Sequence, residues 1–254
     1  MTLLTFGSVP FEAELVVLDK DGTLVDFEMW NTLAAVWVDR LVEGWGGEAL
    51  RQDLGRNLGY DYEKRYSDPQ GPMAIATTGQ VMAIAAGTLY RHGMPWAQAE
   101  ERAQTAFETK DIIPLASLIR PAGDLPALFR SLQSAGVPVA VVTTDHRRDT
   151  EEALQLLGIA DMVDYLLCGD DGITPKPAPD MLLVTCRQMG VEPGRTAVVG
   201  DTLGDLIMAE RAGAGLRVGV LTGAGTREVL APHADVIIES VDAITMLSQS
   251  AVQE

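Results

Sequence analysis

The sequence predicts an α/β fold, a doubly wound parallel sheet of Rossmann-like type with an inserted α-helical cap domain. Short runs rich in Val, Ile and Leu recur along the chain and are too continuous for half-exposed strands. Helix-like segments separate these runs, and several end in a glycine just before the next run, at Gly136, Gly158 and Gly190. Alternating helices and buried strands are typical of a parallel sheet covered by helices on both faces.

Six apolar runs are the predicted strands: Leu15–Asp19, Pro138–Thr144, Tyr165–Gly169, Thr196–Asp201, Arg217–Thr222 and Ala234–Glu239. Three helices are predicted between the later runs: Leu128–Ala135, Glu151–Leu157 and Pro179–Met189. Connections of this kind favour parallel pairing of the strands.

The alternation is interrupted once, after the first strand. The segment that follows has helical patterns and no comparable strand, with predicted helices at Glu28–Val42, Gly47–Leu58, Thr78–His92 and Trp96–Lys110. We therefore expect a core formed by residues 1–24 and 119–254, and a cap domain formed by residues 25–118. Gly59–Thr77 mixes Gly, Pro, Asp and Tyr, so we expect a loop there, and its residues Tyr60–Met73 are candidates to select the substrate.

Charge and composition restrict the class of protein. The 254 residues include 19 basic and 36 acidic side chains, giving a net charge of −17. Such a surface repels nucleic acid and anionic lipid, and a site for a phosphate must supply its own positive charge. The chain has no run of about 20 apolar residues, and its start does not resemble a signal peptide. We expect a cytoplasmic protein that binds neither nucleic acid nor membrane, and both a monomer and a homodimer stay open.

Polar residues follow four of the predicted strands. In order along the chain, they are Asp19, Lys20, Asp21, Gly22 and Thr23 after the first strand; Thr143, Thr144 and Asp145 after the second; Lys176 after the third; and Asp201 with Asp205 after the fourth. Ligands of such sheets bind at the carboxyl ends of the strands, so these residues are expected at one edge. Several carboxylates at one place repel one another, and a shared cation would relieve the repulsion.

These residue types together indicate phosphoryl-transfer chemistry. Hard carboxylate oxygens suit Mg²⁺, and a carboxylate in such a site can attack phosphorus to form an aspartyl-phosphate. A second carboxyl group two residues later can protonate the leaving oxygen and then activate water. A lysine and a threonine hydroxyl can hold the phosphoryl oxygens, and glycines can present backbone N–H groups.

The four segments resemble the motifs of the haloacid dehalogenase (HAD) superfamily, and the resemblance covers nearly the whole chain. The first motif, DxDGT, matches residues 19–23, and the second is a threonine that ends a strand, here Thr143. Lys176 opens a KPxPD sequence similar to that of the phosphoglycolate phosphatase-like branch. The fourth motif, GDxxxD, matches residues 200–205. The chain departs from many relatives at Thr144, where they have asparagine.

The resemblance implies a role for each matching residue. Asp19 is the implied nucleophile and a metal ligand, and Asp21 the general acid and base, with its backbone carbonyl on the metal. Asp201 is implied to bind Mg²⁺, and Asp205 to support it. Four residues are implied to bind the phosphorylated substrate: Thr143, Thr144, Lys176 and Gly22. The implied function is a magnesium-dependent phosphatase acting on a small phosphorylated metabolite, either phosphoglycolate-like or a sugar phosphate.

Two other functions stay open at this point. A sugar phosphomutase similar to β-phosphoglucomutase would use the same catalytic residues and return the phosphoryl group to a sugar. A phospho-aspartate signalling or binding protein would also combine Asp, Thr and Lys on a parallel sheet, although such proteins are shorter and lack the second acid at Asp21. For Lys20, between the two aspartates, we expect a structural ion pair, with a side chain that points away from both.

Overall fold

A computed structural model describes residues 2–108 and 113–247 of the chain. The chain divides into two compact units, one formed by Met1–Asp26 and Ile119–Glu254 and the other by Phe27–Leu118. These limits lie within two residues of the expected limits of the core and the cap domain. The functional assignment of the two units as core and cap stays a prediction.

The first unit contains a six-stranded parallel sheet in the order β10-β9-β8-β3-β6-β7. Its strands are β3 (Leu15–Leu18), β6 (Val139–Val142), β7 (Tyr165–Leu167), β8 (Thr196–Gly200), β9 (Leu216–Val220) and β10 (Val236–Ile238). Every residue of β3, β6 and β8 is buried, which explains their continuous apolar sequences. All six predicted strands are present, and the predicted α/β class is confirmed.

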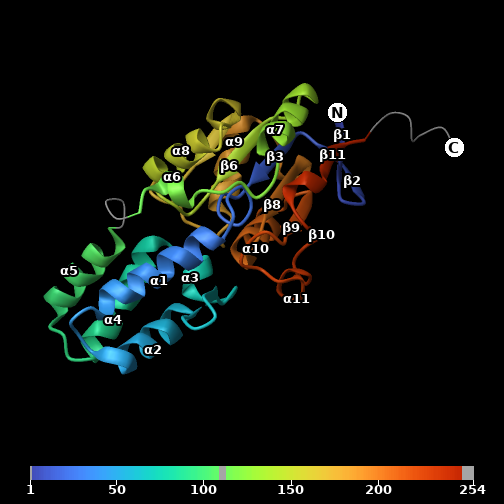
Figure 1. The fold of residues 1–254 in the computed structure, drawn as a ribbon. Coiled ribbons are helices and arrows are strands. Elements are labelled where there is room, and N and C mark those ends of the chain that lie inside the picture. The colour runs from blue at the N-terminus through green and yellow to red at the C-terminus, as the bar shows by residue number, and fades with distance from the viewer. Residues whose placement is uncertain (1, 109–112, 248–254) are drawn as a thin grey trace. The chain divides into compact units, whose positions relative to one another are not determined.

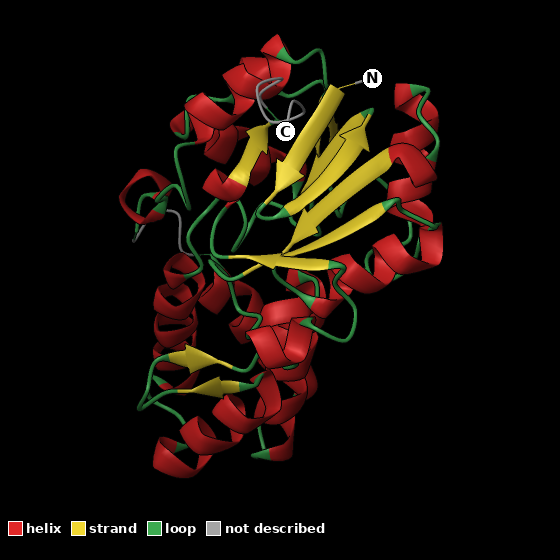
Figure 2. Ribbon diagram, turned by 90° about the vertical axis from the view of Figure 1, so that its right-hand side faces the viewer, coloured by secondary structure: helices red, strands yellow, loops and turns green. Residues whose placement is uncertain are grey.

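Helices cover both faces of this sheet (Figure 2). They are α7 (Leu125–Ser134), α8 (Arg147–Leu156), α9 (Asp180–Met189), α10 (Leu203–Ala212) and the short α11 (Arg227–Leu230), with 3₁₀ turns at Ala160–Met162, Pro193–Arg195 and Val241–Ala243. α9 and α10 bury Met181 and Met208 against Leu15 and Val142 of the sheet. Gly190 adopts the left-handed conformation that ends α9, as its position in the sequence predicts.

A second, antiparallel sheet in this unit was not predicted from the sequence. It has the order β11-β1-β2 and consists of β1 (Thr2–Phe6), β2 (Val9–Ala13) and β11 (Ile244–Met246). β2 alternates between more and less exposed residues instead of forming a continuous buried run. β1 pairs with β11 through Leu4 and Met246, which are far apart in the sequence. A short, half-exposed strand with a distant partner gives little local signal.

The second unit is mainly helical, as predicted, and its helices are drawn in blue to green in Figure 1. They are α1 (Glu28–Val42), α2 (Gly47–Leu58), α3 (Pro72–Ile75), α4 (Thr78–Arg91), α5 (Trp96–Phe107) and α6 (Leu115–Leu118). Their core includes Leu41, Leu54 and Leu89. The predicted last helix extended to Lys110, which lies outside the described residues.

The expected loop Gly59–Thr77 is instead a small structured element. It contains the hairpin β4 (Tyr60–Asp61) and β5 (Tyr66–Ser67), seen beside helices of the same unit in Figure 2, and the helix α3. Gly55 of α2 permits close packing, since a Cβ atom there would lie 2.7 Å from the carbonyl oxygen of Tyr60. The hairpin and α2 line a pocket of about 550 Å³. A role of this segment in substrate selection stays a prediction.

Among residues 2–108 and 113–247, none of the helices is both long and apolar enough to cross a membrane.

Candidate active site

The central strands of the parallel sheet bring three of the predicted site residues to one edge. β3 lies between β6 and β8, and Asp19, Thr143 and Asp201 each directly follow one of these strands. The backbone N–H of Asp19 donates to the carbonyl oxygen of Val199 at 2.9 Å, so the ladder between β3 and β8 continues into the site. Asp19 therefore stands on rigid, buried backbone at the middle of the edge.

Lys176 lies between two of the acidic residues. Its Nζ atom is 2.6 Å from Asp19 Oδ1, 2.5 Å from Asp205 Oδ1 and 2.7 Å from the carbonyl oxygen of Val142. The side chain is only 5% exposed. Burial works to lower the pKa of Lys176, but the two carboxylates outweigh it and raise the pKa above its ordinary value. The residue is therefore a fixed ammonium that joins the ends of β3 and β6 to α10.

Asp205 has a structural as well as an electrostatic role. It is the third residue of α10, and its Oδ2 atom accepts hydrogen bonds from the backbone N–H of Thr202 at 3.1 Å and from Thr202 Oγ1 at 2.6 Å. This is a capping box with aspartate in the usual Glu position. Its Oδ1 atom meets Lys176, so Asp205 fixes the lysine relative to the start of a helix.

Asp201 is fully buried beneath two glycine-containing segments. Its Oδ2 atom accepts from the backbone N–H of Ala224 at 2.9 Å, and Thr23 Oγ1 lies 3.4 Å from its Oδ1 atom. A Cβ atom on Gly22 would lie 2.3 Å from Asp201 Oδ2, and one on Gly223 would lie 1.9 Å away. Both positions therefore require glycine for the backbone to approach this carboxylate.

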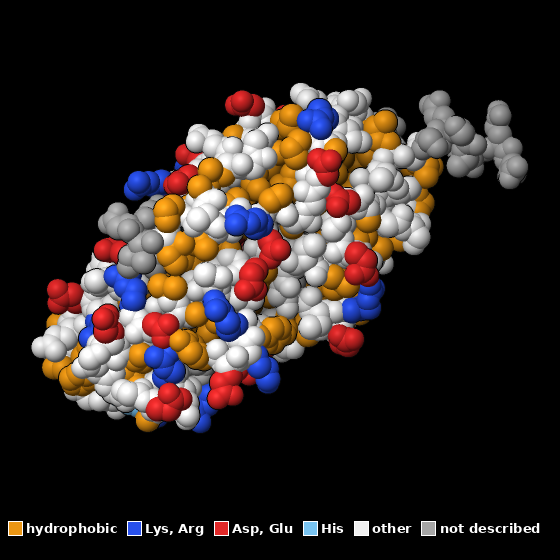
Figure 3. Space-filling view, in the orientation of Figure 1, with side chains coloured by type: hydrophobic (Ala, Val, Ile, Leu, Met, Phe, Trp, Pro, Cys, Tyr) orange, Lys and Arg blue, Asp and Glu red, His pale blue; other side chains and the backbone are white. Residues whose placement is uncertain are grey.

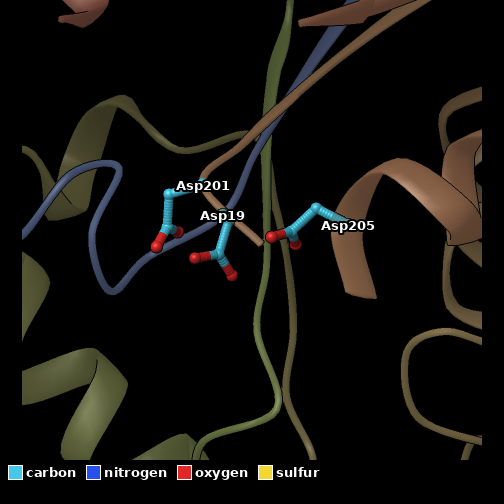
Figure 4. A group of neighbouring side chains, drawn as sticks. All are labelled: Asp19, Asp201 and Asp205. Carbon is cyan, nitrogen blue, oxygen red and sulfur yellow. The ribbon is translucent and has the colours of Figure 1, made fainter. Parts of the chain in front are cut away.

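The carboxyl groups of Asp19, Asp201 and Asp205 face one another (Figure 4). An oxygen from each lies within 4.8 Å of the others, so the three could hold a metal ion. Burial raises the pKa of Asp19 to about 7, opposed by Lys176 and assisted by Asp205 and Asp21. Burial also raises the pKa of Asp201 well above its ordinary value. One ammonium does not balance three acids, and a cation would supply the missing positive charge.

The chemistry and spacing of these donors fit Mg²⁺. Ligands of an octahedral Mg²⁺ at about 2.1 Å lie roughly 3 to 4 Å apart, which is compatible with the oxygens of this group. All are hard carboxylate oxygens, the type that Mg²⁺ prefers. Of the three acids, Asp201 and Asp205 are buried almost completely, while the Asp19 side chain keeps 12% of its surface exposed.

Asp21 belongs to a neighbouring ion pair. Its Oδ1 atom lies 2.7 Å from Lys20 Nζ, which also lies 2.8 Å from Asp145 Oδ2. The expected ion pair of Lys20 is present, but the expectation that Lys20 points away from both aspartates is wrong. The reason is that residues 20–25 are not extended: the N–H groups of Leu24 and Val25 both donate to the carbonyl oxygen of Lys20.

The remaining predicted site residues are Thr143, Thr144 and Gly22. Thr143 is 2% exposed and follows Val142, whose carbonyl oxygen accepts from Lys176. Thr144 packs against Gly169, where a Cβ atom would lie 2.1 Å from the Thr144 carbonyl oxygen. The Gly22 N–H donates to the carbonyl oxygen of Val25 at 2.6 Å, so in this conformation it closes the turn. Phosphate binding by Thr143, Thr144 and Gly22 stays a prediction.

The loop that follows β9 was not predicted to be part of the site. Thr222 Oγ1 donates to the carbonyl oxygen of Gly22 at 2.7 Å, and the next two residues, Gly223 and Ala224, hold Asp201. The sequence Thr-Gly-Ala-Gly at the end of a predicted strand was the available signal, because a strand end with closely spaced glycines allows close backbone approach.

The chain is similar in sequence to several curated phosphatases. Among curated proteins, the chain is 37% identical over 98 residues to N-acetylmuramic acid 6-phosphate phosphatase of Pseudomonas aeruginosa, covering 39% of this chain and 43% of that protein. It is 34% identical over 116 residues to phosphoglycolate phosphatase of Neisseria meningitidis, covering 46% and 49%. The chain thus aligns with less than half the length of these two relatives. It is 29% identical to validoxylamine A 7'-phosphate phosphatase of Streptomyces hygroscopicus, covering 90% and 94%.

Solved structures share the fold of the chain. A HAD family hydrolase from Deinococcus radiodurans, solved with bound phosphate and sodium, superimposes with a TM-score of 0.60 at 21% identity, covering 91% of this chain and 93% of that one. A β-phosphoglucomutase from Clostridium difficile gives a TM-score of 0.59 at 16% identity, covering 91% and 92%. The family profile of haloacid dehalogenase-like hydrolases matches residues 13–213, well over half of the sequence. The chain therefore belongs to the haloacid dehalogenase-like hydrolases.

Proposed function

We propose that the protein is a phosphatase that hydrolyses a small phosphate monoester, with Asp19 as the nucleophile and Mg²⁺ as the cofactor. The observation on which the proposal rests is the arrangement of Asp19, whose carboxylate contacts the buried ammonium of Lys176 beside Asp201 and Asp205. This combination offers a nucleophile, a phosphate-binding cation and a metal site together. The curated relatives described above are phosphatases, which supports the same activity.

In the proposed reaction an Asp19 carboxylate oxygen attacks phosphorus, and the bond from phosphorus to the leaving oxygen breaks. Asp21 gives its proton to that oxygen, so the alcohol leaves neutral. Asp21 then takes a proton from a water molecule that attacks the aspartyl-phosphate, which releases phosphate and restores Asp19. Lys176 and Thr143 hold the phosphoryl oxygens during both steps.

Four residues would hold the metal: Asp19 and Asp201 through carboxylates, Asp21 through its backbone carbonyl, and Asp205 in support. When bound, Mg²⁺ would neutralise charge on the phosphoryl oxygens and on the acids. Because both oxygens of Asp205 already contact Lys176 or Thr202, we infer that Asp205 acts mainly by fixing Lys176.

Lys176 supplies positive charge for the substrate inside the site. On the face shown in Figure 3, acidic and basic side chains are interspersed, and the net charge of the chain is −17. A phosphorylated metabolite would therefore be retained by Lys176 and the cation after it arrives, without strong attraction at long range. Two of the relatives are named for phosphates of N-acetylmuramic acid and of validoxylamine. Sugar-like phosphates and phosphoglycolate are therefore the first substrates to test.

Removal of the metal tests the proposal directly. We expect release of inorganic phosphate from a panel of sugar phosphates and phosphoglycolate in Mg²⁺, and loss of nearly all turnover in excess chelator, with recovery when Mg²⁺ is restored. Measuring free phosphate separates a phosphatase from a phosphomutase, which would yield an isomeric sugar phosphate. A phospho-aspartate that persists for minutes without turnover would indicate a signalling protein instead. Full activity in chelator would contradict the proposal.

Gly223 provides a second test, since it limits the position of Asp201. We expect Gly223→Ala to lower kcat about 100-fold, because the new methyl group would collide with the Asp201 carboxylate and displace a proposed metal ligand. The matched control is Gly194→Ala, where a Cβ atom meets nothing within 4 Å, and its kcat should equal that of the wild type. Equal kcat for the two variants would show that Asp201 does not need its observed position.

A further inference from the structure

Lys20 is a buried lysine that touches two acids from different loops. Its side chain is 2% exposed, and its ammonium lies 2.7 Å from Asp21 Oδ1 and 2.8 Å from Asp145 Oδ2. A lysine is seldom buried this completely unless it is paired. Burial works to lower the pKa of Lys20, but the two carboxylates outweigh it and hold the group charged.

The contacts of Lys20 continue to Thr143, which is proposed to bind phosphate. The backbone N–H of Asp145 donates to Thr143 Oγ1 at 3.2 Å, and the carbonyl oxygen of Asp145 accepts from the Gly169 N–H at 2.8 Å. Asp145 is thus fixed between the ends of β6 and β7. Through it, the Lys20 ammonium joins the loop after β3, which bears Asp21, to the loop after β6, which bears Thr143.

We propose that Lys20 is a positioning residue that fixes the Asp21 carboxyl group relative to Thr143 for proton transfer to the leaving oxygen. The inference rests on the proposed function of Asp21. The terminal torsion of an aspartate is soft, so each contact at a carboxyl oxygen narrows the range of orientations that the group samples. A charge-assisted hydrogen bond to the buried ammonium holds Asp21 Oδ1 in place, which leaves Oδ2 to carry the proton that is transferred. Proton transfer requires the acid within hydrogen-bond reach of the leaving oxygen, so this orientation matters for the rate.

A simpler role for Lys20 would be to neutralise Asp145. The geometry argues for more than that, because the ammonium is shared almost equally between Asp145 and Asp21. The backbone of Lys20 has a separate task, since its carbonyl oxygen accepts from the N–H groups of Leu24 and Val25. A side-chain substitution leaves that turn intact. Positioning of Asp21 and neutralisation of Asp145 can therefore be tested without changing the fold of the loop.

Lys20→Met keeps the unbranched stem and removes the charge, and two substrates reveal its effect. An alkyl phosphate needs a proton on its leaving oxygen, whereas 2,4-dinitrophenyl phosphate does not. We expect the variant to lower kcat/KM about 10- to 100-fold for the alkyl phosphate of the panel that wild type hydrolyses fastest, and to change kcat/KM for the dinitrophenyl ester by less than about threefold. An equal loss on both substrates, or no loss on either, would overturn the inference.

The double variant Lys20→Met with Asp145→Asn separates positioning from neutralisation. It leaves no unpaired Asp145 charge, so it should fold even where the single variant is poorly stable. We expect it to keep the selective loss on the alkyl phosphate, since Asp21 still lacks its ammonium. Recovery of wild-type activity on the same alkyl phosphate would show that Lys20 only balances Asp145. Asp145→Asn alone keeps the contact of Lys20 with Asp21 and should keep the wild-type ratio of the two kcat/KM values.

Wild-type protein and Asp19→Asn separate this inference from the proposed function. If wild type hydrolyses no phosphate ester of the panel in Mg²⁺, or if Asp19→Asn keeps its activity, the proposed function fails and the inference falls with it. If wild type hydrolyses both esters and Asp19→Asn neither, the function stands, and the Lys20 variants alone decide the inference.

Discussion

Asp19→Asn is expected to remove nearly all turnover of every phosphate monoester that the wild-type protein hydrolyses. An amide has nearly the shape of a carboxylate and can still accept a hydrogen bond from Lys176, but it cannot attack phosphorus. Loss of a covalent nucleophile typically costs four or more orders of magnitude, so we expect kcat to fall by about 10⁴-fold or more. Steady-state phosphate release at saturating Mg²⁺ measures this change.

Stability measurements show whether that loss is chemical. Burial and the neighbouring acids raise the pKa of Asp19 to about 7, so the ionised group is held at a cost in the metal-free protein. The variant removes one charge from the cluster while Lys176 keeps Asp205 as its partner. Its melting temperature in metal-free buffer should therefore equal or exceed that of wild type, as is common when strain at a functional site is removed. Added Mg²⁺ should raise the melting temperature of wild type more than that of the variant. A strongly lowered melting temperature would mean that the loss of turnover is due to unfolding.

The parts of the site that could be predicted from the sequence are those written in short, local patterns. β3 and β8 are continuous apolar runs, and each is followed at once by an acid, Asp19 or Asp201. Parallel pairing then puts both acids at the same edge, whatever the details of packing. The contacts of Lys176 with Asp19 and Asp205 agree with the expectation that these residues converge.

Other parts depended on backbone conformation or distant pairing. The direction of Lys20 follows from the turn at residues 20–25, where three N–H groups converge on its carbonyl oxygen. The expectation that Lys20 points away from the two aspartates assumed an extended backbone, in which neighbouring side chains alternate in direction, and the turn is not extended. The support of Asp201 by the Ala224 N–H comes from a loop after another strand, and the closely spaced glycines of that loop were its only signal in the sequence. β1 and β11 pair across most of the chain length, and no local window contains both.

Lys176→Met is expected to have the largest effect on stability. It would leave Asp19 and Asp205 without the ammonium that lies 2.6 Å and 2.5 Å from them. Removing one partner from a buried pair costs about 3–5 kcal/mol, because the remaining charge stays desolvated. The matched control is Lys64→Met, which removes an exposed lysine from its 3.1 Å pair with Asp61 and should cost less than about 1 kcal/mol. Urea unfolding in metal-free buffer measures both changes.

The Lys176 ammonium is also proposed to hold the phosphoryl group, so Lys176→Met should lower both the free energy of unfolding and kcat. A double variant should separate these two effects. Adding Asp205→Asn removes one of the two charges that the single variant leaves uncompensated. The double variant should therefore regain part of the lost free energy of unfolding, a coupling expected for residues in direct contact. It should not regain kcat, since no cation then contacts the phosphoryl oxygens from the Lys176 position.

If the double variant regained both stability and kcat, Lys176 would serve only to balance Asp205, and phosphate binding would have to be assigned elsewhere. If Lys176→Met were as stable as Lys64→Met, the buried carboxylates would not be ionised beside Lys176 in the folded protein.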